Sequence, residues 1–439
     1  MTTGLEGVAA KARVETKLVF TSLAHHVTKD LIKESLEHIP LGTAPGLDGI
    51  GVGTARETFE DWVGEMVTSI HRQCYKAPPV RRVWIPKPGK TEKRPIGVPN
   101  TADRALQRSV MTVLNAIYEE DFLDCSFGGR PGRGQHNALV TINEVIGRKK
   151  VNWVLEADLK NFFGSLDHGW LLRFVEHRVG DPRILSLVRK WLKAGVMEGS
   201  IFEESEVGTP QGGSISVLLS NLYLHYVLDL WFEKAIKPKL EGECYLIRYI
   251  DDFIVCFEYK RDAERFVSVL EKRLAKFSLA LEPSKTGLIE FGRFAERNAK
   301  AKNRKPRTLY FLGFTHYCTT SRKGQFLVGR KTERTRLRRS MSNLQDRIRE
   351  AMHWNVTDQI DRINRTLRGH YNYYGMGGNS RSLSKIYNLA KLYLKKTLNR
   401  RSRKGSITWE LFDKIMKKHP ILQPYLKIPY TEFKNYVML

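Results

Sequence analysis

Three aspartates are the residues of this sequence best suited to chemistry. Asp158 ends the apolar run 151–157, and Asp251 and Asp252 interrupt the apolar run 245–257. If these runs are neighbouring strands of one sheet, the three carboxylates meet at one edge of it. Like charges that close repel one another, and two divalent cations would relieve the repulsion while clamping the attacking and leaving oxygens of a phosphoryl transfer. The spacing therefore favours two-metal phosphoryl transfer.

A simpler interpretation applies to an adjacent pair of aspartates taken alone. Such a pair is more often a turn, and a lone aspartate is more often a helix cap. Here, however, Tyr249-Ile-Asp-Asp-Phe253 follows Gly208-Thr-Pro-Gln-Gly-Gly213, which itself follows the strand that ends at Asp158. This ordered set favours the chemical interpretation.

The elements that must position these residues can be predicted from periodicity and turn chemistry. We expect short strands at 80–86 and 95–99 around a basic hairpin tip, a helix at 103–118, a glycine-rich loop at 127–134 and a helix from near 214. The hairpin within 245–257 is expected to turn at Asp251 and Asp252. From 322 to 404, 22 Lys and Arg stand against 5 Asp and Glu at helical spacing. This change in composition predicts a basic helical domain that begins near residue 325.

The composition indicates the class of partner. The 439 residues contain 73 Lys and Arg against 47 Asp and Glu, a net charge of +26, which favours a polyanion such as nucleic acid. A merely soluble basic surface and an anionic membrane are the alternatives. We expect no membrane partner and a cytoplasmic protein, because the first 24 residues lack a signal-like stretch and the apolar region 215–232 is interrupted by polar residues. Five scattered cysteines without a C-x-x-C pair indicate neither disulfides nor a zinc site.

The order of these segments resembles the fingers and palm of the group II intron family of reverse transcriptases, within the non-LTR-related class. Segments 81–108, 127–139, 155–168, 208–224 and 245–257 resemble its polymerase blocks in turn, 311–314 the block before the thumb, and 367–374 the maturase or thumb signature. The resemblance implies an α+β right-hand polymerase fold, with an antiparallel sheet flanked by helices in the fingers and palm and then an α-helical, maturase-like thumb. The expected boundaries are 1–75 for an N-terminal extension and the start of the fingers, 76–325 for fingers and palm, and 326–439 for the thumb and C-terminal tail.

The resemblance also implies roles for single residues. Asp158, Asp251 and Asp252 would be catalytic and would bind two Mg²⁺ or Mn²⁺ ions together with the Leu159 carbonyl, since such ions prefer hard oxygen ligands. The nucleotide would meet the side chains of Lys87, Arg94, Gln211 and Phe163, the first two at its triphosphate, Gln211 beside the base and Phe163 against a ribose 2′-hydroxyl. Arg130, Arg133 and Ile250 would contact nucleic acid. The alternatives are a solvated charged turn for the basic hairpin and a core phenylalanine at the Phe162–Phe163 pair, which fits Phe162 better.

Several features depart from the family pattern. Ile250 stands where Ala is usual, Val217 where Pro is usual and Gly129 where a bulky aromatic is usual, and we find no Cys/His-rich endonuclease segment after the thumb. The chain most resembles the free-standing enzymes with a Y-I-D-D box, a lineage associated with double-strand-break repair by microhomology end joining. We hypothesise that Ile250 favours short, poorly paired primers, and that the acidic run 203–206 is either an exposed hairpin, the favoured interpretation, or a competitor for the cationic channel.

The implied function is an RNA-directed and DNA-directed DNA polymerase. Its partners would be RNA and DNA template-primers and deoxynucleoside triphosphates, and a homodimer is left open. A group II intron maturase, which is an RNA-binding splicing cofactor, is the alternative from another class. A nuclease that uses the same aspartates is less favoured, because it would leave the nucleotide-side residues without a purpose.

Overall fold

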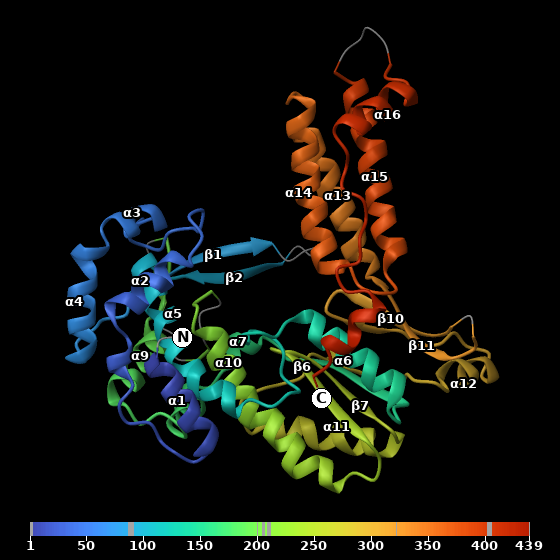
Figure 1. Cartoon of the computed structure of the whole chain (residues 1–439). Helices are drawn as coiled ribbons and strands as arrows, with labels where there is room; N and C mark the ends of the chain where they lie inside the picture. The colour runs from blue at the N-terminus through green and yellow to red at the C-terminus, as the bar shows by residue number, and fades with distance from the viewer. Residues whose placement is uncertain are drawn as a thin grey trace.

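The computed structural model describes residues 3–86, 92–199, 201–203, 207–208, 212–321, 323–401 and 406–438. Figure 1 shows a lobe of helices with a projecting hairpin at the left, a sheet flanked by helices at the lower right, and an upright bundle of long helices above that sheet. We refer to these parts as the fingers, the palm and the thumb. The arrangement confirms the expected α+β class and the order of a fingers-and-palm region followed by a helical region.

The fingers are built around α5 (Thr101–Asp121). Its apolar residues recur at helical spacing and are buried, so that α1 (Thr3–Val14) and α2 (Lys29–Glu37) pack against it. A small sheet of order β2-β1-β4-β5 carries the hairpin of β1 (Val80–Pro86) and β2 (Lys93–Val98). The remaining elements of this part are η1 (Ala24–His26), α3 (Val52–Glu57), α4 (Phe59–His71), α8 (His168–Glu176), α9 (Pro182–Lys193), β4 (Val196–Glu198) and β5 (Ile201–Glu203).

The palm is a sheet of order β6-β7-β3-β8. Its strands are β3 (Trp153–Asp158), β6 (Cys244–Tyr249), β7 (Asp252–Phe257) and β8 (Gly287–Glu290). Both faces of β7 are buried, so its sequence is a continuous apolar run. Covering and connecting segments are α6 (Gln135–Arg148), α7 (Phe162–Ser165), α10 (Ser216–Leu224), the π-helical turns η2 (His225–Asp229) and η3 (Phe232–Ile236), η4 (Lys237–Lys239), α11 (Lys260–Ala275) and η5 (Pro283–Lys285).

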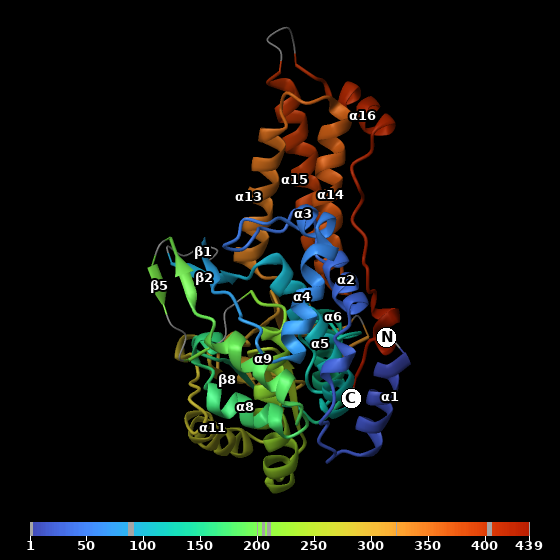
Figure 2. The same ribbon diagram turned by 90° about the vertical axis from the view of Figure 1, so that its left-hand side faces the viewer.

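The thumb rests on a three-stranded sheet of order β11-β10-β9. The elements from this sheet to the end of the described chain are α12 (Ala295–Ala301), β9 (Leu309–Phe311), β10 (Phe314–Thr320), β11 (Phe326–Thr332), α13 (Arg334–Glu350), α14 (Val356–Tyr374), α15 (Ser380–Asn399), α16 (Trp409–Lys418) and η6 (Tyr430–Asn435). After α16 the chain runs back down the bundle, as Figure 2 shows from the side, and Asn137 of α6 donates a 3.2 Å hydrogen bond to the Tyr436 carbonyl. Within the described residues, every helix is too short or too polar to span a lipid bilayer.

Candidate active site

Strand pairing brings the three predicted aspartates to one edge of the palm sheet. β3 and β7 are antiparallel, and their register sets Asp158 opposite Asp252. β6 and β7 pair with Tyr249 opposite Asp252, so Ile250 and Asp251 form a two-residue turn. The prediction that Asp251 and Asp252 form the turn is therefore wrong by one residue, because Asp252 already belongs to β7. Opposed residues on neighbouring antiparallel strands have Cα atoms about 4.5–5.5 Å apart, which places the carboxylates close together.

The turn beside these carboxylates is strained. Ile250 has a φ of +58°, in the left-handed region that β-branched residues almost never adopt. Such a conformation costs on the order of 1–3 kcal/mol and persists only where the surroundings hold it in place. Conformations of this kind concentrate at functional sites, so the strain independently marks this turn as part of the site.

Burial and mutual repulsion govern the electrostatics of the site. Burial raises the pKa of Asp252 to about 8, and the charges of Asp158, Asp251 and Glu156 act in the same direction. Burial, followed by the charge of Asp158, also raises the pKa of Asp251. The unfavourable charge at this edge is the condition that a bound cation would relieve.

Lys285 of η5 supplies a cation to this edge. Its ammonium forms an ion pair with the Asp158 carboxylate, and its charge opposes the rise in the pKa of both Asp251 and Asp252. Among the residues that the structure describes, no three Asp, Glu, His or Cys side chains are gathered tightly enough to hold a metal ion. The carboxylate oxygens of Asp158, Asp251 and Asp252 still fit a hard divalent ion, provided that the ion displaces the Lys285 ammonium from Asp158.

The predicted nucleotide-side residues are only partly placed. Arg94 is exposed on β2, and its charge reaches across to lower the pKa of Asp251 against the larger effect of burial. Phe163 is half-buried in α7, whereas Phe162 is buried, and their rings meet edge to face with centroids 5.4 Å apart. Leu159 follows Asp158 and has a buried side chain. Lys87 and Gln211 lie outside the described residues.

The segment that contains Gln211 is fixed to its surroundings at both described ends. At Gly208, which has a φ of +89°, the backbone N–H donates to the Leu166 carbonyl at 2.8 Å, and the carbonyl lies 2.6 Å from His168 Nε2. At Gly212, which has a φ of +131°, a Cβ would lie 2.3 Å from the Gly97 carbonyl oxygen of β2. Because the backbones approach so closely, both positions require glycine. Gly208 is thus held beside the start of α8, and Gly212 lies against β2.

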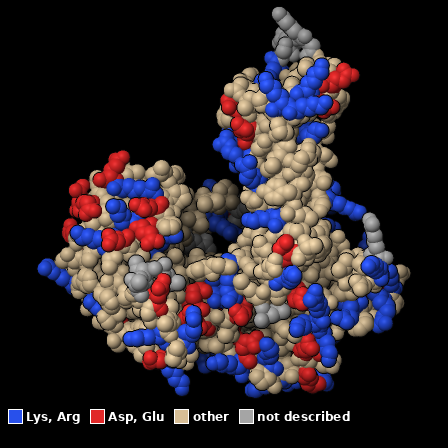
Figure 3. Space-filling model, in the orientation of Figure 1, with Lys and Arg blue, Asp and Glu red and all other residues tan. Residues whose placement is uncertain are grey.

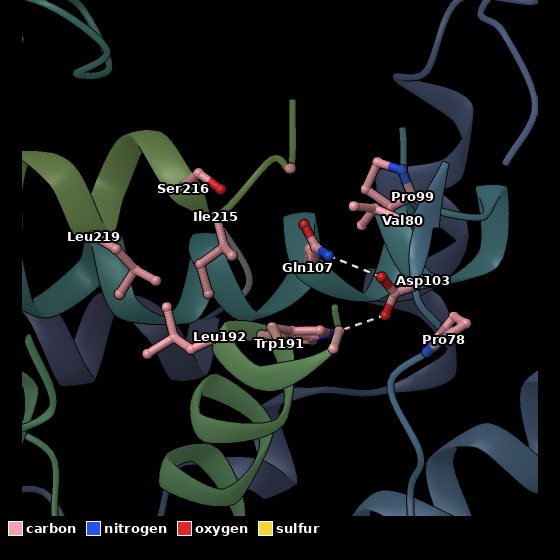
Figure 4. A pocket seen from close by; sticks show the side chains of 12 residues that line it. Pro78, Val80, Pro99, Asp103, Gln107, Trp191, Leu192, Ile215, Ser216 and Leu219 are labelled. Carbon is pink, nitrogen blue, oxygen red and sulfur yellow. Dashed lines mark hydrogen bonds between the residues drawn. The ribbon is translucent and has the colours of Figure 1, made fainter. Parts of the chain in front are cut away.

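The buried carboxylate of Asp103 lies near Gly213, which follows Gly212 in the chain. Figure 4 shows Asp103 and Gln107 of α5 beside Trp191 of α9, around a cavity of about 20 Å³, which is room for about one water molecule. The Asp103 carboxylate accepts hydrogen bonds from Tyr75 Oη at 2.5 Å, Trp191 Nε1 at 2.8 Å and Gln107 Nε2 at 2.8 Å. A Cβ on Gly213 would lie 2.8 Å from Gln107 Oε1, so this network lies directly against the backbone that follows Gly212.

Arg130 requires a correction. Its side chain is only 2% exposed, and its guanidinium donates to the Glu119 carboxylate at 3.0 Å and to the carbonyls of Leu123 and Ser126 at 2.7 and 3.0 Å. A guanidinium enclosed in this way cannot reach a template phosphate in this conformation, so its place in the structure contradicts the predicted contact. Arg133 is less buried and pairs with the Asp124 carboxylate at 2.6 Å.

Sequence reasoning also missed residues that belong to this region. No sequence pattern indicates Lys285, because its pairing with Asp158 depends on a distant part of the chain returning to β3. At that return the Glu282 N–H donates a hydrogen bond to the Asp158 carbonyl at 2.8 Å. From the sequence, Asp103 is only the expected start of a helix. A buried acid on the apolar face of that helix could have been noticed from periodicity, since such a residue must be paired.

Comparison with known proteins identifies relatives among intron-encoded proteins. The group II intron-encoded protein LtrA of Lactococcus lactis subsp. cremoris is 29% identical over 303 residues, which cover 66% of this chain and 50% of that protein. Protein YkfC of Escherichia coli (strain K12) is 33% identical over 198 residues, or 44% of this chain and 52% of that protein. Nuclear intron maturase 3, mitochondrial, of Arabidopsis thaliana is 22% identical over 202 residues, or 40% and 28% of the two chains. The chain thus spans about half the length of the first two relatives.

Two protein-family models match different parts of this chain. Residues 337–417, on α13 to α16, match the group II intron, maturase-specific domain. Residues 85–316, which include β2 and the whole palm sheet, match the reverse transcriptase (RNA-dependent DNA polymerase) family, whose members normally use divalent metal ions. Because that match covers more than half of the chain and includes the three aspartates at the sheet edge, the chain belongs to the reverse transcriptase family.

Proposed function

We propose that this protein is a reverse transcriptase that extends a primer on an RNA or DNA template with deoxynucleoside triphosphates. The observation that carries the proposal is the pairing of Asp158 with Asp252, beside Asp251, within the matched region. In this proposal Asp158 and Asp251 hold two Mg²⁺ or Mn²⁺ ions, with Asp252 and the Leu159 carbonyl nearby. When bound, such ions stabilise the charge on the attacking and leaving oxygens of a phosphoryl transfer.

The nucleotide would lie between the fingers hairpin and the palm edge. Arg94, with Lys87, would bind the triphosphate, since cations on a β-hairpin can form charge-assisted hydrogen bonds to phosphate oxygens. Gln211 would lie beside the incoming base, and Phe163 would exclude a ribose 2′-hydroxyl. The surroundings of Gly208 and Gly212 support these last two roles, because a Cβ on Gly208 would lie 2.8 Å from the Phe163 carbonyl oxygen and one on Gly212 would lie 2.3 Å from the Gly97 carbonyl oxygen of β2.

The template-primer would occupy the hollow between the fingers and the thumb, which is open in Figure 3. The exposed first turns of α13 carry Arg334, Arg336 and Arg338. Farther along, a groove between α13 and α14 is lined by Arg347, Glu350, Arg362 and Arg365. Exposed arginines bind phosphates regardless of nucleic-acid sequence, which suits a polymerase that must move along its template.

Primer extension tests the proposal directly. Matched RNA and DNA templates would be tried with Mg²⁺ and with Mn²⁺, using the wild-type protein and the Asp251→Ala and Asp252→Ala variants. We expect extension on both templates and a loss of at least about a hundredfold in each variant, since metal ions contribute several kcal/mol to transition-state stabilisation. Glu264→Ala removes an exposed acid of α11 and is the matched control. Full extension by either aspartate variant would refute the proposed site.

A second candidate function is that of an intron maturase. The match of residues 337–417 to the maturase-specific domain favours it, and so do relatives named as intron-encoded proteins and maturases. The two functions differ in their need for the aspartates. A protein that stimulates intron splicing equally well with Asp251→Ala, and that extends no primer, would be a maturase.

Double-strand-break repair by microhomology end joining is the more specific role that we propose. Its support is Ile250, whose β-branched side chain adds bulk beside Asp251 in a left-handed turn that only glycine adopts without strain. We propose that this bulk favours short, poorly paired primers. The test compares Ile250→Ala with the wild type on a long primer and on a substrate with a few base pairs of microhomology. An equal change on both substrates would remove the idea.

The acidic run 203–206 remains a hypothesis of regulation. Glu203, its described residue, forms an ion pair of 2.7 Å with Arg82 of β1, and residues 204–206 lie outside the described residues. Replacing the acids by Gln and finding unchanged nucleic-acid affinity at low salt would argue against competition for the cationic channel. A homodimer and the domain boundaries at 75 and 325 likewise remain proposals.

A further inference from the structure

We propose that Arg248 is a positioning residue that fixes the metal-bearing turn, and that Asp229 and Asn221 hold Arg248 in place for this purpose. The inference rests on the proposed function and deepens it. Arg248 lies on β6, two residues before the turn, and is completely buried. A buried guanidinium must have all its donors engaged or it destabilises the fold, so its partners reveal what it holds.

The guanidinium of Arg248 connects the turn to the interior of the palm. Nη1 donates to the Ile250 carbonyl at 3.1 Å and to Asn221 Oδ1 at 2.9 Å. Nε and Nη2 form a bidentate pair with the Asp229 carboxylate, at 2.7 and 2.6 Å, and Nη2 also donates to Ser126 Oγ at 2.8 Å. One planar group thereby joins β6, α10, the η2 turn and the segment before the glycine-rich loop.

The contact with the Ile250 carbonyl acts on the peptide that joins Ile250 to Asp251. Ile250 adopts its left-handed φ of +58° at an energetic cost, and without support the peptide would relax to another orientation. Relaxation would turn the Asp251 side chain away from its place beside Asp158 and Asp252. A charge-assisted hydrogen bond in a dry environment opposes that relaxation.

The partner carboxylate is itself placed by an unusual piece of backbone. Asp229 is fully buried and is the last residue of η2, a π-helical turn that follows α10. π-turns are rare and occur frequently at functional sites, because they rotate one side chain out of the normal helical register. Here the rotated register carries the acid that neutralises Arg248.

The side chain of Ile250 is held from the opposite direction. Asn221, which accepts from Arg248, donates through Nδ2 to the Gly128 carbonyl at 2.7 Å. A Cβ on Gly128 would lie 2.7 Å from Ile250 Cγ1 and 2.9 Å from the Ile250 nitrogen. The glycine-rich loop thus packs directly against the turn. Arg248 holds the carbonyl of Ile250, and the backbone at Gly128 packs against the side chain of Ile250.

A purely structural ion pair is the competing explanation, and a paired replacement separates the two. Removing one partner of a buried ion pair strands the other charge, whereas replacing both with apolar residues is often tolerated. The full-length D229L/R248M variant therefore tests positioning without a stranded charge. The matched control is D121L/R178M, which removes an ion pair of 3.0 Å between a buried arginine and a half-buried aspartate, both distant from the turn in the sequence.

The readouts are the thermal midpoint, kcat, the nucleotide KM, the Mg²⁺ concentration at half-maximal rate, and Mn²⁺ binding followed by electron paramagnetic resonance. We expect D229L/R248M to keep a midpoint close to that of the control, while kcat falls at least tenfold and Mn²⁺ binding weakens at least fivefold. The nucleotide KM should change less than twofold. The control should keep wild-type kcat and Mn²⁺ binding.

Wild-type kcat and Mn²⁺ binding in a folded D229L/R248M variant would overturn the proposal. If that variant does not fold, Arg248→Lys decides, because lysine keeps the charge opposite Asp229 but lacks the planar fork that reaches Ile250 and Asn221. The same tenfold and fivefold losses are expected there, and wild-type values would again overturn the proposal. Failure of the wild type to extend any primer would refute the proposed function instead, and the Mn²⁺ measurement would still test Arg248.

Discussion

Gly129 and Val217 depart from the family pattern, and the structure brings them into contact. Gly129 has a φ of +70°, and a Cβ there would lie 2.2 Å from Val217 Cγ1. Gly129→Ala should therefore cost about 1–2 kcal/mol for the left-handed conformation and about 1–3 kcal/mol more for the clash. In a Val217→Ala background the clashing methyl is absent, so only the conformational cost should remain.

The assay is a double-mutant cycle of urea unfolding on wild type, the two single variants and the double variant. We expect a coupling free energy of about 1–3 kcal/mol in the direction of rescue. Gly132→Ala is the matched control, because Gly132 has nearly the same φ, +69°, and nothing within 4 Å of an added Cβ. It should cost the conformational term alone. Additive effects of Gly129→Ala and Val217→Ala, within about 0.5 kcal/mol, would refute the contact.

Three further predictions concern buried or paired charges. Burial lowers the pKa of His225 from 6.5 to about 4, so the neutral ring is favoured in the fold, and the contribution of His225 to the unfolding free energy should fall by about 1.6 kcal/mol between pH 6.5 and 5. In urea titrations at the two pH values, the pH dependence of His225→Gln should differ from that of the wild type by this amount. Asp103→Ala should cost at least about 2 kcal/mol, because it strands buried donors, and Tyr75→Phe should cost less; equal losses in thermal unfolding would contradict this. Lys285→Met should tighten Mn²⁺ binding in the absence of nucleic acid, since it frees Asp158, and unchanged binding in spectroscopic titration would exclude the competition.

Local patterns were sufficient to predict the strands that carry the aspartates. β1 occupies Val80–Pro86, the range expected from its apolar run, and β3 ends at Asp158 as expected. These strands are specified by neighbouring residues in the sequence, because burial on a sheet requires continuous or alternating apolar residues. The meeting of Asp158 with Asp252 could also be expected, since one ends an apolar strand and the other lies at the tip of an apolar hairpin.

Features set by distant partners could not be predicted. Propensity placed the turn at Asp251 and Asp252, because aspartate tolerates turns better than isoleucine does. The structure instead turns at Ile250, which Arg248 and Gly128 hold in a conformation that isoleucine alone would avoid. The predicted contact of Arg130 with nucleic acid is wrong for the same kind of reason. A glycine-rich loop suggests exposure, whereas the Arg130 side chain pairs with Glu119 of α5.

The strand that begins at Asp252 also separates two hydrophobic cores. Phe253, Val255 and Phe257 face the core shared with the fingers, whereas Ile254 and Cys256 face the core shared with the thumb. Alternation along a strand makes this division unavoidable, since successive side chains point to opposite faces. Movement of the fingers over a nucleotide and movement of the thumb along a duplex would therefore both act on β7. The Arg248 network is placed where it could resist both, because it ties the turn at the start of β7 to α10, to η2 and to Ser126.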